Sequence, residues 1–152
     1  MKKYIIIEII PTHSKSNKGK IIQLQALKID NLNLIDRFDY RLNDDKISNK
    51  DLVNLISYDK DYFTYLDDDK EILKRFSKWS DKLPLLIIDN SYTRSYLKNL
   101  KNRKYSICNY LDTKYTDDLI SELIKEYNLQ PSNHIVDILY ESMILHENKK
   151  KS

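Results

Sequence analysis

A single carboxylate at the end of an apolar strand is the first chemically suggestive feature of this sequence. Residues 4–7 read Tyr-Ile-Ile-Ile and lead directly into Glu8, and Ile10 stands two residues further on, where a second carboxylate would help to hold a metal ion. A pair of Mg²⁺ ions is normally held by several convergent oxygen atoms. A site that keeps one such acid is therefore expected to hold two ions poorly.

Basic and aromatic residues supply a second kind of chemistry. Lys98, Lys101, Arg103 and Lys104 form a local basic run, which suits either a solvated surface or a patch that contacts phosphates. The net charge of +3 neither requires nor excludes a polyanionic partner. Aromatic side chains also stack on unpaired bases. Tyr92 is the best candidate for stacking among the 12 tyrosines, because it is expected just beyond the end of a strand.

Length and composition favour one domain. With 152 residues, of which 41% are hydrophobic, the chain can bury one ordinary core. We expect a single domain over residues 1–147 and a basic disordered tail over residues 148–152. No apolar run approaches the roughly 20 residues that span a bilayer. We therefore expect a cytoplasmic location and no membrane partner. Cys108 is the only cysteine and is expected to be a small core residue.

The first part of the chain has the pattern of strands. Residues 3–10 are a continuous apolar run, as in a strand buried on both faces. Residues 20–30 and 34–42 alternate between apolar and polar side chains. These three segments predict an antiparallel three-strand meander.

Helical periodicity takes over after residue 43. We expect helices over residues 48–56, 68–81, 91–100 and 116–127, and a last helix that begins near residue 132 or 133. Two further strands are expected over residues 84–88 and 105–111. The order predicts an α/β fold in which a mixed five-stranded sheet, the meander plus two strands, is flanked by helices.

This order resembles that of the DnaQ-like DEDDh 3'-5' exonucleases, which have a ribonuclease H-like fold. The resemblance covers residues 3–146. It rests on the opening strand that ends at Glu8 and on four further segments, residues 19–24, 86–91, 111–113 and 133–134. Residues 86–91 are similar to the family's strand that ends in His-Asn-Ala, with Asn90 at the Asn position. The pair Asn133-His134 stands where the family's general-base histidine begins the last helix.

The resemblance implies a metal site that has lost most of its acids. Glu8 occupies the first acid position, Ile10 the second and Arg94 the third. With the usual spacing Leu139 occupies the fourth, and a shorter last loop would place Asp137 there instead. No metal is therefore expected, and if one binds, Glu8 and Asp137 are its ligands. An ion pair between Glu8 and Arg94 is the hypothesis for what replaces the metals, and the alternative is that Arg94 points to solvent.

The role of the histidine depends on the metal. His134 could act as a general base on water only beside a metal-bound nucleophile. Without a metal, we expect it to be an N-terminal helix residue or a capping contact. The residual catalytic candidates are thus Glu8, His134 and Asp137. The binding candidates are Asn90, Tyr92, Arg94, Lys98 and Lys101.

Three functions remain compatible with the sequence. The first is an inactive pseudonuclease that binds single-stranded nucleic acid. The second is a scaffold that uses the same fold to bind another protein. The third is a weak 3'-5' exonuclease that works through Glu8, His134 and Asp137 with Mg²⁺ or Mn²⁺. Whether the protein is an enzyme is left open, because fold does not settle function.

Overall fold

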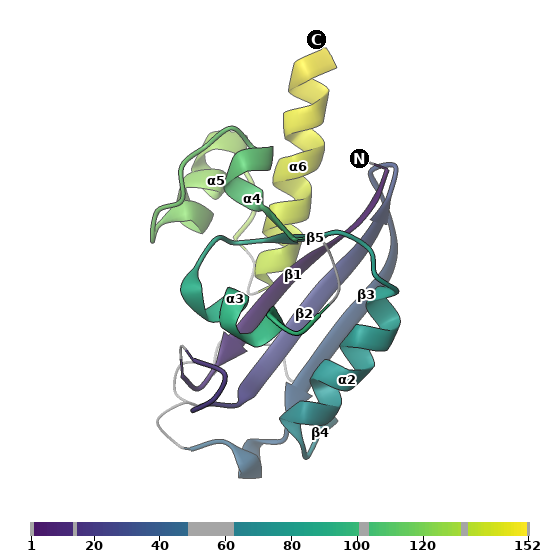
Figure 1. The fold of residues 1–152 in the computed structure, drawn as a ribbon. Helices are drawn as coiled ribbons and strands as arrows, with labels where there is room; N and C mark the ends of the chain where they lie inside the picture. The colour runs from purple at the N-terminus through teal and green to yellow at the C-terminus, as the bar shows by residue number, and fades with distance from the viewer. Residues whose placement is uncertain (1, 14, 49–62, 101–103, 132–133, 152) are drawn as a thin grey trace.

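The fold is a mixed sheet with helices on both faces. The computed structural model describes residues 2–13, 15–48, 63–100, 104–131 and 134–151. Within these residues, six strands form one sheet in the order β4-β3-β2-β1-β5-β6 (Figure 1). The α/β class predicted from the sequence is confirmed, with six strands in place of the expected five.

The predicted meander forms one half of the sheet. Strands β1 (Lys3–Pro11), β2 (Ile21–Asp30) and β3 (Asn33–Leu42) pair in antiparallel fashion. A two-residue turn links β2 to β3, with φ of 51° at Asn31 and 69° at Leu32. Positive φ at both central residues is the geometry whose twist matches a tight hairpin. Asn adopts this backbone more readily than most residues.

Three short strands extend the sheet in parallel. Strand β5 (Leu85–Ile87) pairs with β1, and β6 (Lys104–Ser106) pairs with β5. On the opposite edge, β4 (Thr64–Leu66) pairs with β3 and is the strand that the sequence did not predict. Three residues are too few for a periodic pattern to stand out.

One predicted strand is wrong. The segment expected as a strand over residues 105–111 leaves the sheet after Ser106 and continues as the short helix α4 (Ile107–Tyr110). The hydroxyl of Ser106 accepts a hydrogen bond from the backbone N–H of Cys108 at 3.2 Å and so caps the helix. Cys108 is buried as expected, but in a helix and not in a strand.

The longer helices lie at their predicted positions. They are α2 (Asp69–Ser80), α3 (Ser91–Leu97), α5 (Leu119–Tyr127) and α6 (Ile135–Lys151), and a 3-10 turn, η1 (Asp44–Lys46), follows β3. Helix α3 ends three residues before, and α5 begins three residues after, the predicted bound. The side chains of Asp68 and Asn90 cap α2 and α3. Apart from Ser48, the helix predicted over residues 48–56 lies outside the described residues.

Helix α6 extends to Lys151. Residues 148–151 are therefore helical, and the disordered tail predicted over residues 148–152 is wrong for these four residues. The last turn of α6 carries Lys149, Lys150 and Lys151. Cations at the C-terminal end of a helix interact favourably with the helix dipole. No helix in the described ranges is long and apolar enough to cross a bilayer.

Two cores lie on the two faces of the sheet. Along β1, Ile5, Ile7 and Ile9 join the core beneath α2 and α3, while Tyr4 and Ile6 join the core beneath α4, α5 and α6. Side chains alternate between the faces of a strand, which explains the uninterrupted apolar run in the sequence. Glu8 follows Tyr4 and Ile6 in this alternation, so it lies on the α6 face.

Candidate functional site

A polar area occupies the α6 face of the meander, next to the second core. In the register of the sheet, Glu8 of β1 is opposite Gln25 of β2, which is opposite Asp39 of β3. The next row brings Gln23 opposite Arg41. Of these strand residues, the sequence analysis singled out only Glu8 as a site candidate, whereas its other two catalytic candidates, His134 and Asp137, reach this area from the α6 side. The signal that it missed is the alternation of polar residues along β2 and β3, which places them on one face.

Glu8 is buried at the centre of this area. Its side chain is only 8% exposed, and within the described part of the chain its Oε2 atom has no hydrogen-bond partner. Burial raises the pKa of the Glu8 carboxyl from its ordinary value near 4.5 to about 8. The side chain is therefore largely a neutral carboxylic acid at pH 7, whereas a metal ligand must be ionised.

Asp137 is held by a guanidinium from the sheet. Arg37 of β3 donates from Nη1 to Oδ1 of Asp137 at 2.7 Å and from Nη2 to Oδ2 at 3.3 Å. The same Arg37 donates from Nε to Oδ2 of Asp39 at 3.2 Å. Hydrogen bonds and charges from both carboxylates raise the pKa of Arg37, against the effect of its burial. Two carboxylates thus share one cation, and that cation is an arginine.

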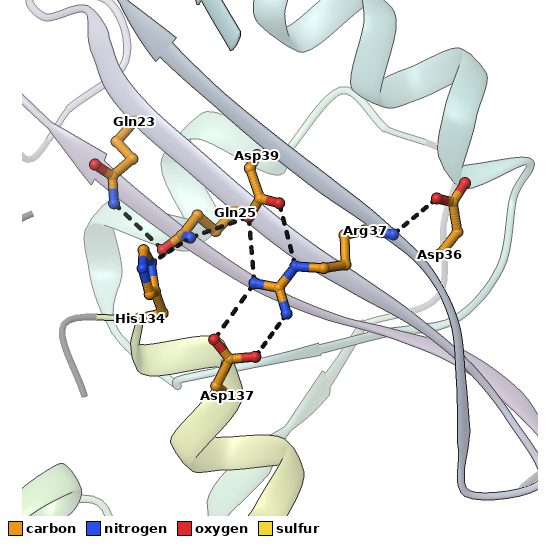
Figure 2. Close-up of polar contacts among 7 residues, drawn as sticks. All are labelled: Gln23, Gln25, Asp36, Arg37, Asp39, His134 and Asp137. Carbon is orange, nitrogen blue, oxygen red and sulfur yellow. Dashed lines mark hydrogen bonds and ion pairs between the residues drawn. The ribbon is translucent and has the colours of Figure 1, made fainter. Parts of the chain in front are cut away.

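His134, at the start of α6, joins the same group of residues. Its Nδ1 atom lies 2.9 Å from Nε2 of Gln25, and Gln25 also donates from Nε2 to Oδ1 of Asp39 at 3.0 Å. With Gln25 as donor, Nδ1 is the acceptor and the ring proton is on Nε2. Figure 2 shows these contacts running from Gln23 to Asp137. We call Gln23, Gln25, Arg37, Asp39, His134 and Asp137 the polar network.

The other acid positions hold no acid and lie apart from one another. Leu139 is fully buried in the core beneath α6, and Ile10 packs against the core on the opposite face. Arg94 projects from α3, with a side chain that is 63% exposed. It donates from Nε to Oδ1 of Asp89 at 2.7 Å.

The predicted ion pair between Glu8 and Arg94 is therefore wrong. The carboxylate of Asp89 lies just before α3 and is within reach of the Arg94 guanidinium. The Glu8 carboxyl is buried and largely neutral, so it offers no charge to attract a cation.

Two binding candidates, Asn90 and Tyr92, lie at the start of α3. Asn90 accepts a hydrogen bond at Oδ1 from the backbone N–H of Thr93 at 2.9 Å and so caps α3. Tyr92 is half-buried, and its pKa is raised by burial and then by the Glu8 carboxyl, which is ionised at the alkaline pH where a tyrosine titrates. Tyr92 lies in the first turn of α3 and is near enough to Glu8 for the two side chains to interact electrostatically. Lys98 is exposed at the end of α3, and Lys101 lies outside the described residues.

The residues at these positions do not fit a pair of Mg²⁺ ions. Such a site needs several ionised oxygen ligands at one point. Burial raises the pKa of Glu8 and so disfavours its ionised form, and Asp137 is engaged by Arg37. Among the residues that the structure describes, no group of three or more His, Cys, Asp and Glu side chains is arranged to hold a metal ion.

Comparison with known sequences gives a weak match. No family model matches the sequence. The PolC-type DNA polymerase III of two strains of Staphylococcus epidermidis is 22% identical over an alignment of 143 positions that covers 86% of this chain. The chain spans only 10% of the length of these polymerases.

Comparison with solved structures defines the fold. The zinc-bound form of E. coli exonuclease I with single-stranded DNA matches all of this chain with a TM-score of 0.62 and 12% identity. A complex of exonuclease I with SSB-Ct matches 99% of the chain with a TM-score of 0.58 and 12% identity. The chain spans 41% and 42% of the length of these two proteins. At this level of identity the likeness concerns the fold, and the chain has the ribonuclease H-like fold of the DnaQ-like exonucleases.

Proposed function

We propose that this protein binds single-stranded nucleic acid with an exonuclease fold and does not hydrolyse it. The observation that carries the proposal is the ion pair between Arg37 and Asp137, together with the second ion pair of Arg37 with Asp39. In this proposal the guanidinium takes the place of the metal ions that two-metal nucleases require.

The argument against hydrolysis rests on charge. Two unit charges about 4 Å apart interact by roughly 4 kcal/mol at an effective dielectric of about 20. A divalent cation next to Arg37 would meet at least that repulsion. It would also have to draw ionised ligands from Glu8, whose pKa is raised to about 8. The remaining candidate base, His134, already accepts at Nδ1 from Gln25, and without a metal-bound water it has no nucleophile to activate.

The argument for binding rests on the end of the sheet beyond Glu8. Exonuclease I binds single-stranded DNA in one of the matched structures. In this chain the corresponding end of the sheet has a half-buried aromatic ring at Tyr92 and cationic side chains at Arg94 and Lys98. Aromatic rings stack on unpaired bases, and cations track the backbone of a single strand.

Fluorescence anisotropy of labelled single-stranded DNA and RNA, measured in EDTA, tests the binding half of the proposal. We expect saturable binding that weakens as salt is added. For each contacted phosphate, the logarithm of the association constant should fall by about 0.7 when the logarithm of the salt concentration rises by one. Tyr92→Ala should weaken binding at least about fivefold, because base stacking is worth about 1–3 kcal/mol. Lys74→Ala, on the exposed side of α2, is the matched control and should bind as the wild type does.

Release of the 3' nucleotide from the same strands, with Mg²⁺ or Mn²⁺, tests the other half. We expect no release above background from the wild-type protein. Release that is abolished by Glu8→Ala would overturn the claim that hydrolysis is lost. Absence of both binding and release from a folded protein would contradict the proposal and favour the scaffold hypothesis instead.

A further inference from the structure

A basic pocket lies at one edge of the sheet, along the edge strand β6 and beside α3. Two adjoining hollows of about 400 and 360 Å³ share four lining residues. These are Arg94, Lys104, Tyr105 and Ser106. The larger hollow adds Asp89, and the smaller adds Lys98. We call these two hollows together the edge pocket. It lies outside the polar network, and it shares Arg94 and Lys98 with the surface proposed above to contact a single strand.

The cations of the edge pocket outnumber its carboxylates. Arg94 is paired with Asp89 through Nε at 2.7 Å. In the described part of the chain, neither Lys98 nor Lys104 forms an ion pair with a carboxylate. Three cations and one carboxylate therefore leave an excess of two positive charges around the pocket.

Lys104 is the residue that makes this excess costly. Its side chain is half-buried on the edge strand β6, and its pKa is lowered by that burial and then by the nearby charge of Arg94. An ammonium group that loses water without gaining a counter-charge is unfavourable. A bound anion beside the edge strand would supply that counter-charge.

We propose that the edge pocket binds a phosphate monoester through Lys98, Lys104 and Arg94. A phosphate monoester carries about −1.5 to −2 charges at pH 7, which matches the excess, whereas a phosphodiester carries only one. Pockets of about 300–1,000 Å³ hold small molecules, so the space beside Tyr105 admits the sugar or base of a nucleotide as well. The recognition of phosphate does not depend on the proposed function. The further statement that the phosphate belongs to a nucleotide does rest on it.

Isothermal titration calorimetry at low salt tests the phosphate part directly. The probes are inorganic phosphate and a nucleoside 5'-monophosphate, titrated into the wild-type chain and into Lys98→Met, Lys104→Met and the control Lys74→Met. We expect saturable binding by the wild type and a loss of at least about tenfold for each of the first two variants, because each removes one charge-assisted hydrogen bond. Lys74→Met should bind as the wild type does.

The Lys98 variant is a check that does not depend on the Lys104 variant. Lys98 is exposed, so its substitution does not threaten the sheet, whereas Lys104 lies on the edge strand β6. A far-ultraviolet circular dichroism spectrum confirms the fold of each variant. If Lys98→Met binds both probes as tightly as the wild type, or if the wild type shows no saturable binding, the inference is wrong.

Three matched oligonucleotides separate the sources of the monoester. They carry a 5'-phosphate, a 3'-phosphate or no terminal phosphate. Tighter binding of one phosphorylated strand than of the mononucleotide, lost in Lys104→Met, would assign the pocket to that end of a strand. Equal binding of the phosphorylated strands and the mononucleotide would assign the pocket to free nucleotides.

If the unphosphorylated strand binds but inorganic phosphate does not, the proposed function stands and this inference fails. If phosphate binds but no strand does, the proposed function fails instead.

Discussion

Arg37 of β3 and Asp137 of α6 form a two-pronged ion pair, with Nη1 to Oδ1 at 2.7 Å and Nη2 to Oδ2 at 3.3 Å. The pair joins the meander to the last helix across 100 residues of sequence. Each side chain is 27% exposed, so the contact is only partly screened by water. It fixes the first turn of α6, and with it His134, against the sheet.

The coupling between these two residues is measurable by a double-mutant cycle. We expect Arg37→Met and Asp137→Asn each to destabilise the fold, with a coupling free energy of about 1–2 kcal/mol, since bidentate charge-assisted pairs are the strong ones. The measurement is urea unfolding of the wild type, both single variants and the double variant.

Arg75 and Glu71 provide the matched control for this cycle. They form an ion pair on the exposed face of α2, with Nε 3.3 Å from Oε1. Exposed helix pairs contribute little, so their coupling should be clearly smaller. Equal coupling in the two cycles would show that the pair of Arg37 and Asp137 is an ordinary surface contact.

Glu8 predicts an unusual dependence of stability on pH. Its folded pKa of about 8 lies above the ordinary value near 4.5, so between these values the folded state binds more protons than the unfolded state. The Glu8 contribution to the free energy of unfolding is therefore unchanged below pH 4.5 and falls by about 1.4 kcal/mol per pH unit as the pH rises towards 8. Glu8→Gln should abolish this fall and be more stable than the wild type at pH 8.

Urea midpoints measured between pH 5 and pH 8 would test this, with Glu141→Gln on the exposed side of α6 as the control. The stability difference between Glu8→Gln and the wild type should grow with pH, and that of Glu141→Gln should not. A Glu8→Gln variant that tracks the wild type at every pH would mean that the carboxyl is ionised in the folded protein.

Metal ions should stabilise an Arg37 variant more than the wild type. Ligand binding to the folded state raises stability by RT ln(1 + [L]/Kd), so about 10 mM Mg²⁺ or Mn²⁺ should leave the Tm of the wild type unchanged if the guanidinium occupies the place of the cation. Arg37→Met leaves Asp39 and Asp137 without their shared cation and should gain a Mn²⁺-dependent rise in Tm. Equal rises in both proteins, measured by thermal unfolding against EDTA, would argue that the metal binds elsewhere.

Gly19 is required by close approach. A Cβ atom built there would lie 2.9 Å from the backbone nitrogen of His13 and would also clash with the hydroxyl of Tyr96. We expect Gly19→Ala to cost about 1–3 kcal/mol, as overpacking does. In a Tyr96→Phe background the added cost should be smaller, because one of the clashing atoms is gone. An unchanged cost, measured by urea unfolding, would place the strain at His13 alone.

Local pattern was enough to predict most of the elements. The apolar run of β1 and the alternation of β2 and β3 specify a meander, because a strand buries its side chains with period two. The helical spacing and the acidic residues before α2 specify that helix, whose N-cap is the side chain of Asp68. The strand β4 and the break after Ser106 escaped prediction, since a three-residue strand and a local serine cap leave no periodic signal.

The candidate site was only partly visible in the sequence. The sequence by itself determined that Glu8 follows an apolar strand and that Ile10, Arg94 and Leu139 are not acids. Only the tertiary structure decided that Arg94 pairs with Asp89 and that Arg37 pairs with Asp137. The physical reason is that ion pairing depends on which charges lie within a few ångströms after the chain has folded. Likewise, only burial in the folded sheet raises the pKa of Glu8 to about 8 and makes the retained acid neutral.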